Sequence, residues 1–151
     1  MFLLDSNIYI AGFNDASFGA ALRAFHQAHL PRMVLSAVVV HELLVGARDG
    51  RREHTLRRKL VEPFRARRRV HVPGAQTWEL AATLDRRLRA LGGFNESLTQ
   101  RSFANDLLIA ASARELGATI VTSNVADFAL IGRVLDFRYE APWPALAQER
   151  K

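Results

Sequence analysis

Four acidic residues occupy positions from which their carboxylates can reach a common point. Asp5 directly follows the apolar run Phe2–Leu4, and Glu42 lies inside the apolar stretch SAVVVHELLVGA. Asp106 is expected to open the helix NDLLIAASARELGA, and Asp127 falls shortly after a strand-like segment, in VTSNVADF. Three of the four thus follow predicted strands, and Asp106 can fold back beside them.

Carboxylates grouped without cysteine or clustered histidine favour a hard cation, because Mg²⁺ and Mn²⁺ prefer oxygen ligands and retain several waters. Glu42 needs a cation or hydrogen-bond donors in its apolar surroundings, since burying an unpaired carboxylate is costly. Mutual repulsion should also keep one or more of the carboxylates at a raised pKa until a cation binds. A cation held there can activate water for in-line attack on a phosphodiester.

Taken singly, each carboxylate is better explained as a structural residue. Four residues are of types that cap helix N-termini: Asp5, Ser6, Asn105 and Asp106. Asn124 and Asp127 have capping-box-like spacing, and Glu42 could hydrogen-bond to His41 or to an arginine. Taken together, the set favours a shared site, because ligands of open parallel sheets bind beyond the carboxyl ends of the strands.

The elements that must position these residues are short apolar runs alternating with segments of helical periodicity. The predicted strands are Met1–Leu4, Met33–Leu35, Val70–Val72, Thr119–Thr122 and Val134–Phe137. The predicted helices are Ala16–His29, Ala37–Arg48, a basic helix near Arg51–Arg67, Thr77–Leu91 and Asp106–Leu116. Ser36 is placed to cap the second of these helices, and Gly117 follows the last.

Strands alternating with helices predict βαβ units with right-handed crossovers and a mainly parallel sheet covered on both faces. The fold class is therefore α/β. The absence of repeats and linkers predicts one domain over residues 1–151, with a long mobile loop after Gly92-Gly93 over 94–102.

Composition limits the setting and the partners. The chain lacks cysteine, which fits a reducing cytoplasm, and no apolar run is long enough for a membrane span. Net charge is +6, but the segment Arg48–Arg69 alone carries +7. A segment of this kind favours polyanions such as nucleic acid, although a solvated helix face explains it equally well.

The ordered motifs FLLDSNIYI, SAVVVHELLVGA, NDLLIAASARELGATIVTSNVADF and VLDFRYE resemble a PIN-domain ribonuclease of the VapC toxin type. The resemblance spans nearly the whole chain. It implies a three-layer α/β/α fold with four to five strands and Mg²⁺- or Mn²⁺-dependent endonucleolytic cleavage of RNA. It also implies a homodimer that a VapB-type antitoxin neutralises, with no membrane association.

The resemblance carries over to particular residues. Asp5 and Asp106 match the principal metal ligands, Glu42 completes the acidic site, and Asp127 supports the cation or its waters. A supporting role in orienting carboxylates and water is implied for four polar residues: Ser6, Asn7, Thr122 and Asn124. The residues before Asp106, LTQRSFAN, depart from the family pattern, which bears on the conformation of that loop.

Two other functions compete with a nuclease. A catalytically silent PIN-like domain would bind nucleic acid or protein through the basic segment, yet all four acids are present. A phosphoaspartyl enzyme would use Asp5 as its nucleophile, but Asn7 stands where a second aspartate is expected. His26 and His29 are three residues apart on one helix, a possible metal pair without a third ligand nearby.

Overall fold

The structure, a computed structural model, describes residues 1–93 and 100–143. Its centre is a five-stranded sheet in the order β3-β2-β1-β4-β5, and each neighbouring pair of strands is parallel. The strands are β1 (Phe2–Leu4), β2 (Met33–Ser36), β3 (Val70–His71), β4 (Thr119–Val121) and β5 (Arg138–Glu140). Because β1 lies between β2 and β4, the order of strands reverses at β1, which is where ligands of such sheets bind.

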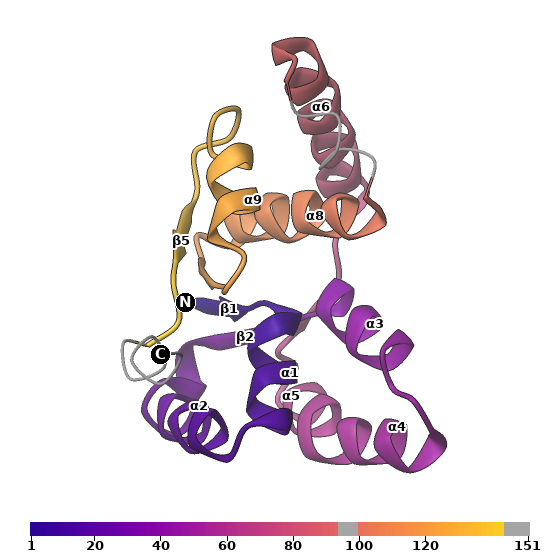
Figure 1. Cartoon of the computed structure of the whole chain (residues 1–151), viewed down its shortest axis with the longest axis vertical. Helices are drawn as coiled ribbons and strands as arrows, with labels where there is room; N and C mark the ends of the chain where they lie inside the picture. The colour runs from indigo at the N-terminus through magenta and orange to yellow at the C-terminus, as the bar shows by residue number, and fades with distance from the viewer. Residues whose placement is uncertain (94–99, 144–151) are drawn as a thin grey trace.

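Helices connect the strands. They are α1 (Ser6–Asn14), α2 (Ala16–His29), a 3-10 turn η1 (Leu30–Arg32), α3 (Ala37–Val45), α4 (Gly50–Leu56), a π-helical turn η2 (Arg57–Val61), α5 (Glu62–Ala66), α6 (Ala75–Leu91), α8 (Arg101–Leu116) and α9 (Val125–Ile131). Helices α6, α8 and α9 lie on one side of the sheet, and α1, α2, α4 and α5 lie on the other (Figure 1). Helix α3 contacts both α1 and α8. The predicted three-layer α/β/α fold is confirmed.

The core explains why the central strand carries no polar residue. Leu3 and Leu4 of β1 are fully buried, as is Ile120 of the neighbouring strand. A parallel sheet covered on both faces needs such apolar runs, because neither side of its strands meets water. Asp5 directly follows this run and therefore lies at the edge of the sheet, where the strand ends.

Several helix caps that the sequence indicates are present in the structure. Asp5 is the N-cap of α1, and its Oδ1 accepts a hydrogen bond from the Ser6 backbone N–H. Ser36 caps α3 through its Oγ, which accepts from the Val38 N–H. Gly117 ends α8 with φ of 61°, a left-handed conformation that glycine adopts at little cost.

Three predicted boundaries are wrong by several residues. Helix α8 begins at Arg101 with Gln100 as N-cap, so Asp106 lies in the second turn and does not open the helix. Phe103 and Leu107 are both buried, four residues apart, so packing of this face extends the helix toward its N-terminus. The part of the predicted loop at 101–102 is therefore helical, and residues 94–99 lie outside the described part of the chain.

A second misplaced element is the last strand, which was predicted over Val134–Phe137 but is formed by Arg138–Glu140. The backbone N–H groups of Val134 and Leu135 bond instead to the Ile131 carbonyl, so these residues form a turn that ends α9. Helix α3 also ends three residues earlier than predicted, at Val45.

The predicted basic helix is present as a continuous rod made of α4, η2 and α5, spanning 50–66. Its buried row consists of Leu56, Leu60, Val61 and Phe64. Within the described residues, no helix is both long and apolar enough to span a membrane.

Candidate metal site at the carboxyl edge of the sheet

Asp5 is held by donors from two neighbouring strand ends. Its Oδ1 accepts from the Ser6 N–H, and its Oδ2 accepts from the Asn7 amide and the Thr122 hydroxyl, each at 2.7 Å. The Asn7 side-chain amide N–H also donates to Thr122 Oγ1 at 3.1 Å, and the side-chain Oδ1 of Asn7 accepts from the Ser123 backbone N–H. These bonds join β1 to β4 beyond their ends and fix the carboxylate of Asp5.

A second group of carboxylates lies around Asn124. Its amide donates to Asp127 Oδ2 at 2.7 Å and to Asp106 Oδ2 at 3.3 Å. The expected capping box is therefore wrong, because Asn124 is the N-cap of α9 but its side chain makes no capping bond. The amide instead joins the carboxylates of α8 and α9.

Glu42 comes from α3 and meets α8. Its Oε1 accepts a 2.9 Å hydrogen bond from the Asn105 amide, and among the side chains that the structure describes neither His41 nor an arginine is its partner. Its Oε2 is buried and has no hydrogen-bond partner within the described part of the chain. A buried carboxylate oxygen without a donor carries a large desolvation cost, so this atom is suited to receive a cation.

The four acids influence one another's protonation. Burial, together with repulsion from Asp5, Glu42 and Asp127, raises the pKa of Asp106 to about 8. The pKa of Asp5 is also raised, chiefly by burial and less by Glu42, while its bonds from Thr122, Ser6 and Asn7 oppose the shift. Asp5 and Asp106 are only 3% and 5% exposed. Four acids crowded in this way favour any event that neutralises them.

A divalent cation fits the chemistry of these residues. The candidate ligand atoms are carboxylate oxygens, one of them without a hydrogen-bond partner among the described residues, and burial and mutual repulsion raise the pKa of Asp106 to about 8. In the described part of the chain, however, no three acidic or histidine side chains are arranged around one point at coordination distance. The carboxylates are thus close enough to repel one another, yet not collapsed onto a common centre.

The predicted site residues are brought together with one qualification. Of the eight predicted acidic and supporting polar residues, seven contribute side chains to the hydrogen bonds described above, whereas Ser6 contributes its backbone N–H. Asn105, considered in the sequence only as a helix cap, was missed as the donor to Glu42. Its position directly before Asp106 was the available signal.

The histidine pair is not a metal site. The ring of His26 packs edge-on against those of Tyr9 and Phe64, and His29 packs against Phe2 and Phe25. These contacts make both histidines part of the packing between α2 and its neighbours.

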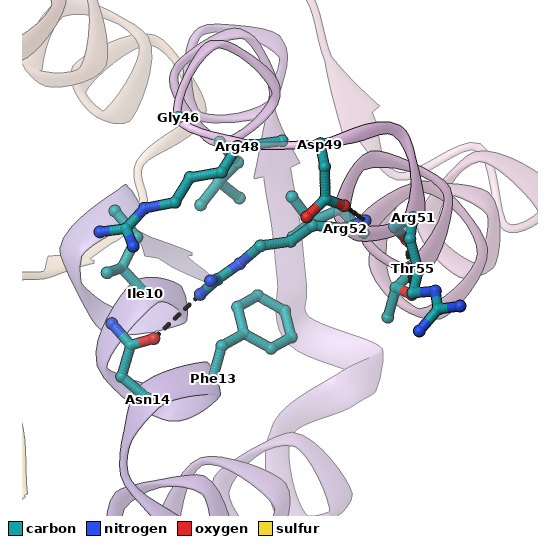
Figure 2. A pocket seen from close by; sticks show the side chains of 12 residues that line it. Ile10, Phe13, Asn14, Gly46, Arg48, Asp49, Arg51, Arg52 and Thr55 are labelled. Atoms are coloured by element: carbon teal, nitrogen blue, oxygen red, sulfur yellow. Dashed lines mark hydrogen bonds between the residues drawn. The ribbon is translucent and has the colours of Figure 1, made fainter.

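A cavity of about 810 Å³ lies beside the carboxylates rather than among them. Its walls come from α1 and from the α3–α4 region, including Ile10, Phe13 and Leu43 (Figure 2). Arg52 spans the opening, where its guanidinium donates to the Asn14 side chain at 2.9 Å. Apolar and polar residues thus share the lining, in which three arginines accompany a single acidic residue, Asp49.

The chain that forms this parallel sheet, with acidic residues at its carboxyl edge, matches the model of a known family. The family model described as PIN domain matches residues 2–133, and the chain therefore belongs to the PIN domain family. No curated protein matches the chain.

Solved structures of toxin–antitoxin proteins share the fold. A chain of the DNA-bound VapBC structure from Salmonella typhimurium is 26% identical with a TM-score of 0.62, and the match covers 93% of this chain and 96% of that one. VapBC2 from Rickettsia felis, bound to a promoter DNA fragment, gives 23% and 0.63, covering 94% and 98%. FitAcB from Neisseria gonorrhoeae gives 22% and 0.65, covering 95% and 99%. The expected similarity to VapC-type PIN proteins is confirmed.

Proposed function

We propose that this protein is a Mg²⁺- or Mn²⁺-dependent endoribonuclease and the toxin of a VapBC-type toxin–antitoxin pair. Asp5, Glu42, Asp106 and Asp127 would hold the cation, and the neighbouring polar residues would orient them. The observation that carries the proposal is the grouping of three acids, Asp5, Glu42 and Asp127, around a buried Asp106 whose pKa is raised to about 8. Membership of the PIN family supports nuclease chemistry at this edge.

A bound divalent cation would supply a Lewis acid and an acidified water for in-line displacement at phosphorus. The chain's own residues prepare the place. Thr122 and Asn7 keep Asp5 oriented with hydrogen bonds to its charged form, and Asn105 orients Glu42 so that its Oε2 stays free. Asn124 holds Asp106 and Asp127 on one amide. Asp106 would release its proton when the cation binds.

The test is cleavage of single-stranded or looped RNA by the purified protein with Mn²⁺, with EDTA and as Asp106→Asn. We expect cleavage only by the wild type with a divalent cation. Asp136→Asn is a matched control, because its side chain is fully exposed and contacts Arg114. RNA cutting that persists in excess EDTA or in Asp106→Asn would contradict the proposal. Salt-sensitive RNA binding without cleavage would instead indicate the catalytically silent domain.

The cavity between α1 and α3–α4 supports the antitoxin part of the proposal. Ile10 and Phe13, both close to half exposed, present apolar surface beside Arg48 and Arg52. An isolated patch of this kind suits an amphipathic segment of a partner. We further propose that residues 1–151 form a single PIN-like domain that assembles as a homodimer, which light scattering of the purified protein would test.

A further inference from the structure

The rod formed by α4, η2 and α5 presents an exposed row of cations opposite its buried row. We define the basic ridge as six exposed residues of this rod and its C-terminal cap: Arg57, Arg58, Lys59, Arg65, Arg67 and Arg68. The π-helical turn contributes the first three, which lie between the buried Leu56 and Leu60. The ridge therefore lies on the exposed face of an amphipathic rod, opposite its apolar row.

Internal pairing neutralises only part of this charge. Glu53 binds Arg57 at 2.8 Å and Glu62 binds Arg65 at 2.6 Å. Arg58, Lys59 and Arg68 have no ion-pair partner within the described residues. Like charges held this close repel one another, which costs stability unless an anion is recruited.

Arg68 gives an independent sign of a role outside folding. It occupies the C′ position of a Schellman motif, in which the Arg69 N–H bonds to the Phe64 carbonyl and the Arg68 N–H bonds to the Arg65 carbonyl. Its φ is 54°, and it is the one non-glycine residue with positive φ in the described part of the chain. Glycine is preferred at C′, so arginine here keeps a cation in place at a conformational cost.

The surroundings favour a phosphate backbone over a protein surface. No large apolar side chain between residues 46 and 71 is exposed, whereas protein interfaces have an apolar centre from which charged residues are depleted. Unpaired cations without interleaved apolar groups suit sequence-independent contacts with phosphates. Helix α4, the first part of the rod that carries the ridge, contacts α3, and α3 carries Glu42.

We propose that the basic ridge binds the phosphate backbone of substrate RNA outside the cleavage site. It thereby anchors the RNA strand whose neighbouring nucleotides reach the four acids at the carboxyl edge of the sheet. The proposal rests on the proposed function, since it assumes that RNA is the substrate. It assigns Arg58, Lys59 and Arg68 as the main phosphate contacts, because their charge is not neutralised within the protein.

The experiment measures binding of a fluorescein-labelled single-stranded oligouridylate to the full-length Asp106→Asn protein in EDTA. The test variant adds Arg58→Gln, Lys59→Gln and Arg68→Gln. The control variant adds Arg23→Gln, Arg86→Gln and Arg87→Gln, which remove the same net charge from exposed positions on α2 and α6. Affinity is measured across salt concentrations from about 50 to 200 mM.

We expect the ridge variant to bind about tenfold more weakly than the control, with a salt dependence shallower by about 2 log units per decade, since each single-strand phosphate contact contributes about 0.7. Equal affinity and slope in the two variants would overturn the proposal. Arg68→Gly alone should weaken RNA binding while raising the melting temperature, which a merely structural role for Arg68 does not produce. Because binding is measured without cleavage, failure of the nuclease proposal would show separately, as no RNA cutting by wild type with Mn²⁺.

Discussion

The Thr122 hydroxyl donates a 2.7 Å hydrogen bond to Oδ2 of Asp5, across the ends of two neighbouring strands and 117 residues of sequence. The same oxygen of Thr122 accepts from the Asn7 amide and from the Asn124 N–H. One buried hydroxyl thus joins the end of β1 to the turn that carries Asn124 and, through it, to Asp106 and Asp127. Its removal should therefore affect the whole acidic group.

Thr122→Val keeps the shape of the side chain and removes this bond, so the pKa of Asp5 should rise further. We expect RNA cleavage at neutral pH to fall about tenfold, because hydrogen bonds to charged groups contribute about 1.5–3 kcal/mol. The acidic limb of the pH–rate profile should move to higher pH. Thr122→Ser should restore both, and an unchanged profile in Thr122→Val would show that this bond does not tune Asp5.

Asp106→Asn should stabilise the metal-free protein at pH 8. The pKa of Asp106 in the folded protein, about 8, is above its unfolded value, so its contribution is complete below about pH 4 and is lost as pH rises toward 8. Asparagine mimics the protonated form at every pH. We expect a gain on the order of 2 kcal/mol at pH 8 and little difference at pH 4, measured by urea unfolding in EDTA.

Added Mn²⁺ should reverse this order of stability. A cation that binds the folded state stabilises it by mass action, and the wild type should gain more than Asp106→Asn. Thermal unfolding at pH 8 with and without Mn²⁺ measures the difference. Equal shifts in melting temperature for the two proteins would exclude Asp106 as a ligand.

Asn105→Ala should leave both oxygens of Glu42 without a donor in the described structure. We expect a loss of about 1 kcal/mol in unfolding free energy and about tenfold in cleavage at limiting Mn²⁺. Ser102→Ala, at an exposed position of the same helix, is the control. Excess Mn²⁺ should recover part of the activity, since the defect lies in orienting a ligand.

Arg68→Gly should raise the unfolding free energy by about 1 kcal/mol, because glycine adopts positive φ without the strain that arginine bears. Arg67→Gly, at the preceding C-cap with φ of −91°, has no such strain to relieve and should not stabilise. Chemical denaturation of the two variants separates conformational relief from the shared loss of one positive charge.

Phe13→Asp should weaken the complex with a cognate antitoxin and leave RNA cleavage by the free protein unchanged. Phe13 is 45% exposed and lines the cavity, whose lining includes none of the four acids. Titration of inhibition by the antitoxin checks the first expectation. Loss of cleavage in Phe13→Asp alone would place the cavity within the catalytic surface.

Local patterns in the sequence determined much of this protein. The apolar run before Asp5, the capping serine at position 36 and the glycine at position 117 each act through neighbouring residues, so strand ends and helix caps were predictable. The four acids could also be identified, because each stands at a recognisable position relative to a predicted strand or helix. The boundary errors at Asp106 and at the last strand arose where long-range packing outweighs local periodicity.

Only the tertiary structure decided how the acids interact. Asn105 donates to Glu42 across 63 positions and Thr122 to Asp5 across 117, and such pairings depend on how helices and strands pack. The raised pKa of Asp106 likewise comes from burial and from three carboxylates distant in sequence. The sequence thus specified which groups stand at the strand ends, while the fold determined their distances, and with these their charge, because electrostatic and hydrogen-bond energies depend on separation in space.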